Sequence, residues 1–259
     1  MSRGQFLNPL LDPMDRVLKR AAPHLCPYYR RWPYTGEIWL TEVDLRGAWS
    51  RELNFFYARL PKVANSTILG SLVDGARARG IGKDLKPKQF FARPSAARAA
   101  DVERIAKEAF KFAFVRDPFA RTLSAYLDKV VKTRAAARRA RRWFARNGIA
   151  APDFAAFCRY LDDGGLHDDP HWAPQTQVLP MPLDALDFLG RMERLDEDIA
   201  VVHNRIFGES PASLQRRGPK PTGSSNRLAE HYTEDALAIV RRLYAADFEK
   251  LGYPLQLPR

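Results

Sequence analysis

Two short segments of this 259-residue sequence combine side chains that can bind an anion. The first reads PKVANST and directly follows the apolar run 54–60. It consists of Pro61, Lys62, Val63, Ala64, Asn65, Ser66 and Thr67. Lysine supplies a point charge, and serine and threonine supply hydroxyl donors. If a helix begins here, its unpaired N–H groups and its positive end would also favour a phosphate. The sequence therefore predicts a phosphate-binding strand–loop–helix at residues 61–67.

This loop contains no glycine. The nucleotide-binding pattern GxxxxGK[ST] is absent, which disfavours ATP or GTP as the ligand. From the residues alone, an ordinary strand–helix turn with a surface lysine remains an alternative to a phosphate site.

The second segment reads RDPFARTLS and follows the apolar run KFAFV at residues 111–115. Arg116 lies at the end of this predicted strand, and Ser124 lies two helical turns into the predicted helix. We expect both to reach one anion at the carboxyl edge of the sheet, where open α/β folds bind ligands. Asp117 followed by Pro118 is typical of a helix start. Arg121 is open to a structural interpretation, as the partner of a carboxylate.

Alternating apolar and helical patterns connect these segments. We predict strands at 54–60, 111–115 and 187–191, and helices at 66–78, 101–110, 119 onward, 153–161, 196–207 and 234–250. This alternation favours an α/β fold with a parallel sheet covered by helices on both faces. The length suits one domain over residues 1–259, with 1–50 as an extension packed on the core.

Together the two segments resemble the donor site of sulfotransferases. PKVANST is similar to the 5′-phosphosulfate loop, and FVRDPFARTLSAYLDK is similar to the 3′-phosphate site, with the same spacing between Arg116 and Ser124. The resemblance is to the Golgi carbohydrate group that includes the chondroitin 4-O-sulfotransferases, whose segments read PKVACTNW and FVREPFERLVSAYRDK. Further similar pieces follow in the same order, namely His171-Trp172, DFLGRME at 187–193 and LYAADF at 243–248. The resemblance covers residues 54–253 and implies a P-loop-like three-layer fold with a central parallel sheet flanked by helices.

The resemblance implies a sulfotransferase that uses 3′-phosphoadenosine 5′-phosphosulfate (PAPS), releases PAP and needs no metal. Lys62 would contact the bridging oxygen, and the rest of residues 61–67 would hold the 5′-phosphate. Arg116 and Ser124 would bind the 3′-phosphate. The basic loop 208–226, which contains Lys220, is similar in composition to a loop that closes over the donor in cytosolic sulfotransferases.

Transfer to a hydroxyl needs a general base. His171 is the first choice, because it occupies the family-like His-Trp position after Asp168 and Asp169. A structural histidine beside Trp172 is the alternative. Some relatives carry their base between the two donor segments, where this sequence offers weaker carboxylate candidates. These are Asp84, Asp101, Glu103 and Glu108.

The sequence departs from the Golgi enzymes after the His-Trp pair. Their LCxPC cysteines correspond here to Leu179 and Pro182, and Cys26 and Cys158 are predicted to be unpaired. We also find no membrane anchor, and these two departures from the Golgi enzymes lead us to expect a cytoplasmic protein.

The formal net charge of +12 implies anionic partners. Residues 132–146 contain seven basic side chains and no acidic one. Three interpretations stay open for them: a solvated face, a groove for an anionic saccharide acceptor, and a nucleic-acid surface, which we favour least. Peripheral membrane contact is also compatible with the charge. A carbohydrate hydroxyl is the expected acceptor. The alternatives are a non-catalytic polyanion- or nucleic-acid-binding protein and a nucleotide-dependent kinase.

Overall fold

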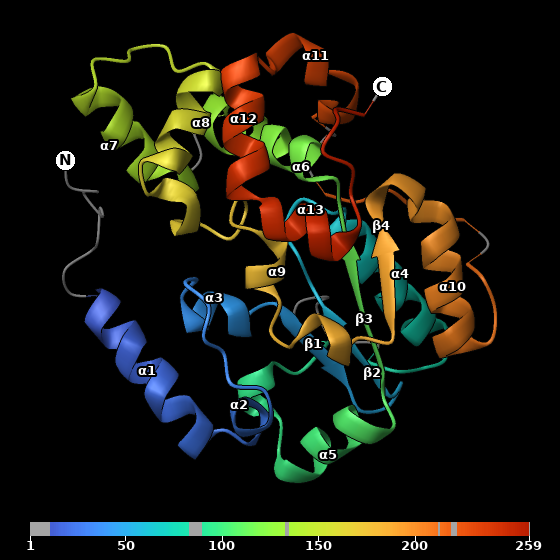
Figure 1. The fold of residues 1–259 in the computed structure, drawn as a ribbon. Helices are drawn as coiled ribbons and strands as arrows, with labels where there is room; N and C mark the ends of the chain where they lie inside the picture. Colours follow the sequence, from blue (N-terminus) through green and yellow to red (C-terminus); the bar gives the residue numbers. More distant parts are fainter. Residues whose placement is uncertain (1–10, 83–89, 133–134, 212, 219–221, 259) are drawn as a thin grey trace. The chain divides into compact units, whose positions relative to one another are not determined.

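The computed structural model describes residues 11–82, 90–132, 135–211, 213–218 and 222–258 (Figure 1). These residues form two compact units. The sheet unit consists of the described residues of 12–115 and 178–219, and the helical unit consists of those of 116–177 and 220–258. The expectation of one domain over residues 1–259 stays a prediction.

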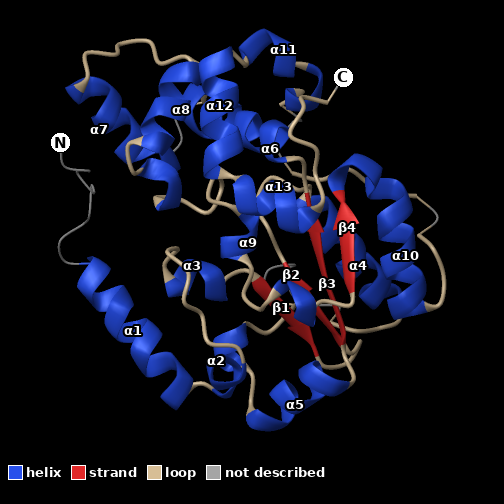
Figure 2. Ribbon diagram, viewed as in Figure 1, coloured by secondary structure: helices blue, strands red, loops and turns tan. Residues whose placement is uncertain are grey.

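A four-stranded sheet forms the centre of the sheet unit (Figure 2). Its strands, in both sequence and spatial order, are β1 (Gly47–Ser50), β2 (Phe55–Ala58), β3 (Phe110–Val115) and β4 (Phe188–Arg191). β2, β3 and β4 run parallel, and β1 pairs antiparallel with β2. The predicted α/β class with a largely parallel sheet is therefore confirmed, and β1 is a strand that the sequence did not predict.

Aromatic side chains fill the centre of this sheet. All four residues of β2 are fully buried, and Tyr57 stacks on Phe112 of β3 with ring centroids 4.9 Å apart. At the next strand, a Cβ on Gly190 of β4 would lie 2.6 Å from the Phe114 ring, so only glycine allows this close approach. The DFLGRME segment thus has a packing role in the sheet.

Helices surround the sheet within this unit. They are α1 (Leu11–Leu25), α2 (Pro27–Arg31), α3 (Leu40–Asp44), α4 (Asn65–Ala78), α5 (Ala99–Lys107) and α10 (Leu195–Phe207), with short 3₁₀ turns at Pro94–Ala96, Leu183–Ala185 and Met192–Arg194. α4 buries Ile68, Leu72 and Ala76, whose spacing of four residues gives one apolar helix face. α10 packs beside α4 and β4 (Figure 1).

The helical unit begins directly after β3. Its elements are α6 (Pro118–Ala125), a π-helical segment (Tyr126–Val131), α7 (Arg138–Arg146), α8 (Phe154–Asp162), α9 (Gln175–Val178), α11 (Leu228–His231), α12 (Glu234–Leu243) and α13 (Ala245–Leu251), with 3₁₀ turns at Ala135–Ala137, Gly165–His167 and Ser224–Asn226. α8 packs against α7 and α12.

Three predicted helices have different bounds in the structure. The helical pattern predicted from 119 to about 146 is divided into α6, the π-helical segment and α7, which begins at Arg138. The helix predicted at 101–110 ends at Lys107, because Phe110 already pairs in β3. The long helix predicted at 234–250 is broken at Tyr244 into α12 and α13. Tertiary contacts explain the break: the Tyr244 hydroxyl donates to the Trp172 carbonyl at 2.5 Å, and Asp247 accepts hydrogen bonds from the start of α9. The LYAADF segment therefore fastens α13 to the rest of its unit.

Candidate active site

The predicted phosphate loop lies between β2 and α4. Lys62 and Ala64 adopt left-handed backbone conformations, with φ of 70° and 60°. Residues other than glycine avoid this region, and each such residue costs about 1–3 kcal/mol when the surrounding structure imposes it. The loop therefore reaches a glycine-like geometry without glycine, and such strain is concentrated at functional sites.

The start of α4 carries no side-chain cap. Ala64 occupies the N-cap position, where alanine is a poor capping residue, and no acidic residue lies in the first turn. A 14-residue helix with an open N-terminus, preceded by left-handed residues, suits an anion because its N–H groups and its dipole act together. The backbone geometry thus fits the predicted 5′-phosphate position.

The hydroxyls at this helix start differ in their surroundings. Ser66 is exposed, whereas Thr67 is buried. Thr67 Oγ1 accepts a hydrogen bond from Arg217 N at 2.9 Å and lies 3.2 Å from the Arg217 carbonyl oxygen, to which it donates. A Cβ on Gly218 would lie 3.1 Å from Ser66 Cβ. The segment around Arg217 therefore covers the first turn of α4.

The second predicted phosphate site has Arg116 at its centre. This residue follows β3 and is 5% exposed. Its guanidinium donates to Ser224 Oγ at 2.8 Å and to Ser225 Oγ at 2.9 Å. Ser124 Oγ lies 3.1 Å from Thr222 Oγ1, which in turn lies 3.3 Å from Ser224 Oγ. A chain of hydroxyls thus connects Arg116 with Ser124, and we call these five residues the hydroxyl cluster.

The hydroxyl cluster is made of groups that bind phosphate. A guanidinium presents several donors in a fixed plane, and each hydroxyl can rotate to donate to an oxyanion. The 116/124 spacing predicted the first two members. The other three lie in the basic loop 208–226, about a hundred residues further along the chain, so their position depends on tertiary structure. The sequence signals for them were the composition of this loop and the Ser-Ser pair after Gly223.

The start of α6 is closed by its own residues. Asp117 caps the helix by accepting a hydrogen bond from Ala120 N at 2.8 Å, and Pro118 occupies the first turn. This agrees with the predicted helix start. At this segment the predicted phosphate-binding groups are therefore side chains, because the helix N-terminus is already capped.

Arg121 is structural, as one interpretation of the sequence had it, but its observed partners differ from the expected carboxylate. The side chain is 1% exposed and donates to the carbonyl oxygens of Ala173 and Pro170, at 2.7 and 2.9 Å. These carbonyls flank His171. Arg121 therefore fixes the loop that carries the predicted base to α6.

His171 forms a close pair with Asp169. The Asp169 carboxylate oxygen Oδ1 lies 2.5 Å from His171 Nδ1 and accepts a hydrogen bond from the His171 backbone N–H at 2.8 Å. A proton on Nδ1 that points to the carboxylate makes Nε2 the basic nitrogen of the neutral ring. The His171 side chain is 26% exposed, so solvent and small molecules reach it. The adjacent Trp172 is fully buried and supports the loop from inside.

Asp168, beside this pair, anchors the loop on its other side. Its carboxylate accepts hydrogen bonds from the Tyr160 hydroxyl and from Arg139 of α7, both at 2.5 Å. Part of the basic charge at 132–146 is therefore used inside the helical unit. Trp143 and Phe144 of the same helix are buried, which gives α7 one apolar side.

The alternative carboxylates lie on or near α5. Asp101 caps this helix and is held by Arg51, whose guanidinium lies 2.7 and 2.8 Å from its oxygens and lowers the pKa of the carboxyl. A carboxylate stabilised in its charged form is a poor base. Glu103 and Glu108 are exposed. Asp84 and the predicted donor-binding Lys220 lie outside the described residues.

Within the described part of the chain, no group of His, Cys, Asp and Glu side chains could hold a metal ion. Cys26 and Cys158 are free thiols. Among the described helices, none combines the length and the apolar character needed to cross a membrane.

Comparisons with known proteins find relatives of this chain. The chain is 28% identical over 229 residues to carbohydrate sulfotransferase 14 of Danio rerio, covering 79% of this chain and 61% of the relative. It is 28% identical over 228 residues to the Mus musculus protein of that name, covering 80% and 59%, and 29% identical over 178 residues to carbohydrate sulfotransferase 12 of Mus musculus, covering 57% and 41%. The chain thus spans about 60% of the length of the first two relatives.

No solved structure matches the chain significantly. The sequence profile described as Sulfotransferase family matches residues 48–254, which include both strand–loop–helix segments and His171. The chain therefore belongs to the sulfotransferase family.

Proposed function

We propose that this protein transfers a sulfonate group from PAPS to a hydroxyl of a carbohydrate acceptor. The hydroxyl cluster is the observation that carries the proposal. Its buried guanidinium and the four hydroxyls linked to it suit the 3′-phosphate that distinguishes PAPS from ATP. The choice of a carbohydrate as the acceptor rests on the names of the relatives, which are carbohydrate sulfotransferases.

When bound, PAPS supplies the sulfonate, which moves to the acceptor oxygen as its bond to the 5′-phosphate oxygen breaks. Arg116 and Ser124 hold the 3′-phosphate together with Thr222, Ser224 and Ser225. Residues 61–67 hold the 5′-phosphate through the open start of α4, and the Lys62 ammonium stabilises negative charge that develops on the leaving oxygen.

The acceptor hydroxyl must lose its proton as its oxygen attacks. His171 Nε2 takes that proton, and Asp169 stabilises the imidazolium that forms, because its carboxylate already lies against Nδ1. Asp169 acts through His171, so it is a positioning residue. Arg121 keeps the loop in place by binding its carbonyl oxygens.

Thermal shift and sulfonate transfer together test the proposal. PAP should raise the melting temperature more than ATP with Mg²⁺, and labelled PAPS should transfer label to a saccharide acceptor. Stabilisation by ATP–Mg²⁺ alone would point to the kinase alternative, and stabilisation by polyanions alone would point to a non-catalytic binding protein.

The base is tested by a matched pair of histidine variants. His171→Ala should lower kcat by about a hundredfold or more, the usual worth of a general base, and leave PAP affinity nearly unchanged. His231→Ala, a change at the half-buried histidine of α11, is the control and should retain turnover. Near-normal turnover of His171→Ala would reject His171 as the base while leaving the donor site untouched.

A further inference from the structure

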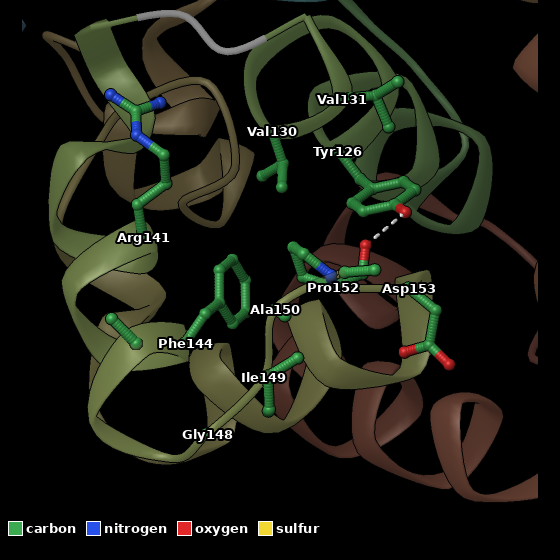
Figure 3. Close-up of a pocket in the computed structure, with 12 residues that line it drawn as sticks. Tyr126, Val130, Val131, Arg141, Phe144, Gly148, Ile149, Ala150, Pro152 and Asp153 are labelled. Atoms are coloured by element: carbon green, nitrogen blue, oxygen red, sulfur yellow. Dashed lines mark hydrogen bonds between the residues drawn. The ribbon is translucent and has the colours of Figure 1, made fainter.

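A large cavity in the helical unit has no part in the proposed donor site. It has a volume of about 930 Å³ and lies between the π-helical segment, the second half of α7 and the loop 148–153 (Figure 3). Small-molecule sites in proteins have volumes of roughly 300–1,000 Å³, so this cavity could hold a ligand of that size.

The cavity lining is predominantly apolar. Tyr126, Val130 and Phe144 are buried residues at its base, and Figure 3 shows Val130 and Phe144 facing the space between them. The polar atom of Tyr126 is engaged, because its hydroxyl donates to the Pro152 carbonyl at 2.9 Å. The remaining apolar lining residues are Val131, Ala145, Ile149, Ala150, Ala151 and Pro152. A hydrocarbon chain that covered this surface would be bound favourably, because apolar area on both would be removed from water.

One cation and one carboxylate are among the residues that line this cavity. Arg141 of α7 lines one side, and exposed Arg138, Arg142 and Arg146 lie on the same helix. Residues 132–146 contain no acidic side chain. Asp153 is the one lining carboxylate, and it caps α8 by accepting a hydrogen bond from Ala156 N at 2.7 Å. In Figure 3, Arg141 and Asp153 lie on opposite sides of the cavity. The Arg141 side thus favours an anionic group.

The wall formed by residues 126–131 is π-helical, a rare conformation that is found mainly at functional sites. It continues the helix that carries Ser124. The unusual turn widens the helix at the point where the cavity lining begins, which supports a binding role for the cavity.

We propose that this cavity binds the hydrocarbon chain of an anionic amphiphile, with the chain against Phe144 and Val130 and the anionic group at Arg141. This binding site goes beyond the proposed sulfotransferase function and does not rest on it.

Calorimetric titration with decyl phosphate, kept below its micellar concentration, tests the binding. Decyl phosphate should bind, and inorganic phosphate should not bind under the same conditions, because it lacks the chain. Ala145→Trp fills the cavity and should weaken decyl phosphate binding by about tenfold or more, which corresponds to about 1.4 kcal/mol. Arg142→Trp places the same side chain on the exposed surface of α7 and should leave binding unchanged.

A second pair tests the anionic end. Arg141→Gln should weaken decyl phosphate binding but not decyl maltoside binding, whereas Arg142→Gln should weaken neither. Equal losses in both arginine variants, or full binding by Ala145→Trp, would overturn the proposal.

Stabilisation by PAP, measured on every variant, separates this proposal from the proposed function. If PAP stabilises none of the proteins but decyl phosphate binds as described, the donor assignment fails and the cavity assignment stands. If PAP stabilises all of them and decyl phosphate does not bind the parent protein, the reverse holds.

Discussion

Two helices of this protein begin directly after parallel strands, and they begin in opposite ways. α4 follows β2 with an uncapped start at Ala64 and left-handed backbone at Lys62 and Ala64. α6 follows β3 with Asp117 as its cap and Pro118 in its first turn. The first start has no side-chain cap for its backbone N–H groups, whereas the second start is capped by its own Asp117.

The difference assigns different chemistry to the two segments. Under the proposed function, the main chain and Lys62 would supply the anion-binding groups at α4, so that site would depend on backbone shape. At α6 the groups would be the side chains of Arg116 and Ser124, so that site would depend on residue identity. Two strand–loop–helix segments of similar appearance would then bind two phosphates by separate means.

The largest effect should follow loss of the side-chain site. Arg116→Ala should weaken PAP binding by about 3 kcal/mol, or roughly a hundredfold, because a buried charge-assisted contact is removed. Adenosine 5′-phosphate, which lacks the 3′-phosphate, should lose little, so the variant should no longer distinguish the two ligands in calorimetry. Arg227→Ala is the control, since Arg227 pairs with exposed Glu230. Equal losses for both ligands would contradict the assignment of Arg116.

The helix start at α6 should matter for stability and not for ligand choice. Asp117→Ala removes the cap and should destabilise the protein by about 1 kcal/mol, lowering Tm by about 2–4 °C. Asp117→Asn retains an acceptor and should restore most of the loss. Asp153→Ala, at the capped start of α8, should behave similarly. A change in the preference for PAP over adenosine 5′-phosphate in Asp117→Asn would show that the cap itself is part of the ligand site.

The strain at α4 should be measurable with a single substitution. Ala64→Gly should stabilise the protein by about 1 kcal/mol in denaturant unfolding, because glycine adopts positive φ without the steric cost of a Cβ. Ala106→Gly, within α5, should instead destabilise by about 1 kcal/mol. If Ala64→Gly destabilises the protein as much as Ala106→Gly does, residue 64 does not adopt the left-handed conformation in solution.

The smallest effect concerns pH and the body of α4. Burial, assisted by the nearby Arg79 guanidinium, lowers the pKa of His203, whose Nε2 lies 3.1 Å from Ser71 Oγ of α4. The folded pKa then lies below the unfolded value of about 6.5, so this contribution to stability is complete above that pH and is lost as the pH falls through the folded pKa. Tm measured from pH 7 to pH 5 should fall less in His203→Gln than in the parent protein. His24→Gln, at an exposed position of α1, should retain the parent slope; if His203→Gln retains it too, His203 does not contribute.

The sequence predicted the parts of the fold that local pattern determines. The apolar runs located β2, β3 and β4, and the Asp-Pro pair located the start of α6. β1 was missed because it begins with glycine, lacks an apolar run like that of β2 and is defined by its pairing with β2. The break at Tyr244 was missed because Trp172 and α9, not local propensity, impose it.

In the candidate site, too, local sequence predicted some features and tertiary structure determines the others. The spacing between the end of β3 and α6 predicted that Arg116 and Ser124 belong together, and hydroxyls connect the two residues in the structure. The composition of the loop 208–226 suggested that it closes over the donor. It did not predict that Thr222 and the Ser224–Ser225 pair meet Arg116, since no periodicity relates them to residue 116. The left-handed conformations of Lys62 and Ala64 were also beyond prediction, because the usual sign of such geometry is glycine and the loop has none.

The backbone at residues 62 and 64 also has a kinetic consequence. Packing holds the loop in this conformation, because Leu60, Val63 and Thr67 are buried, so an arriving anion need not pull the loop into shape. Binding to a preorganised site costs little ordering entropy and needs no slow rearrangement. In stopped-flow mixing, the observed rate of PAP association should therefore rise linearly with PAP concentration and should not reach a plateau.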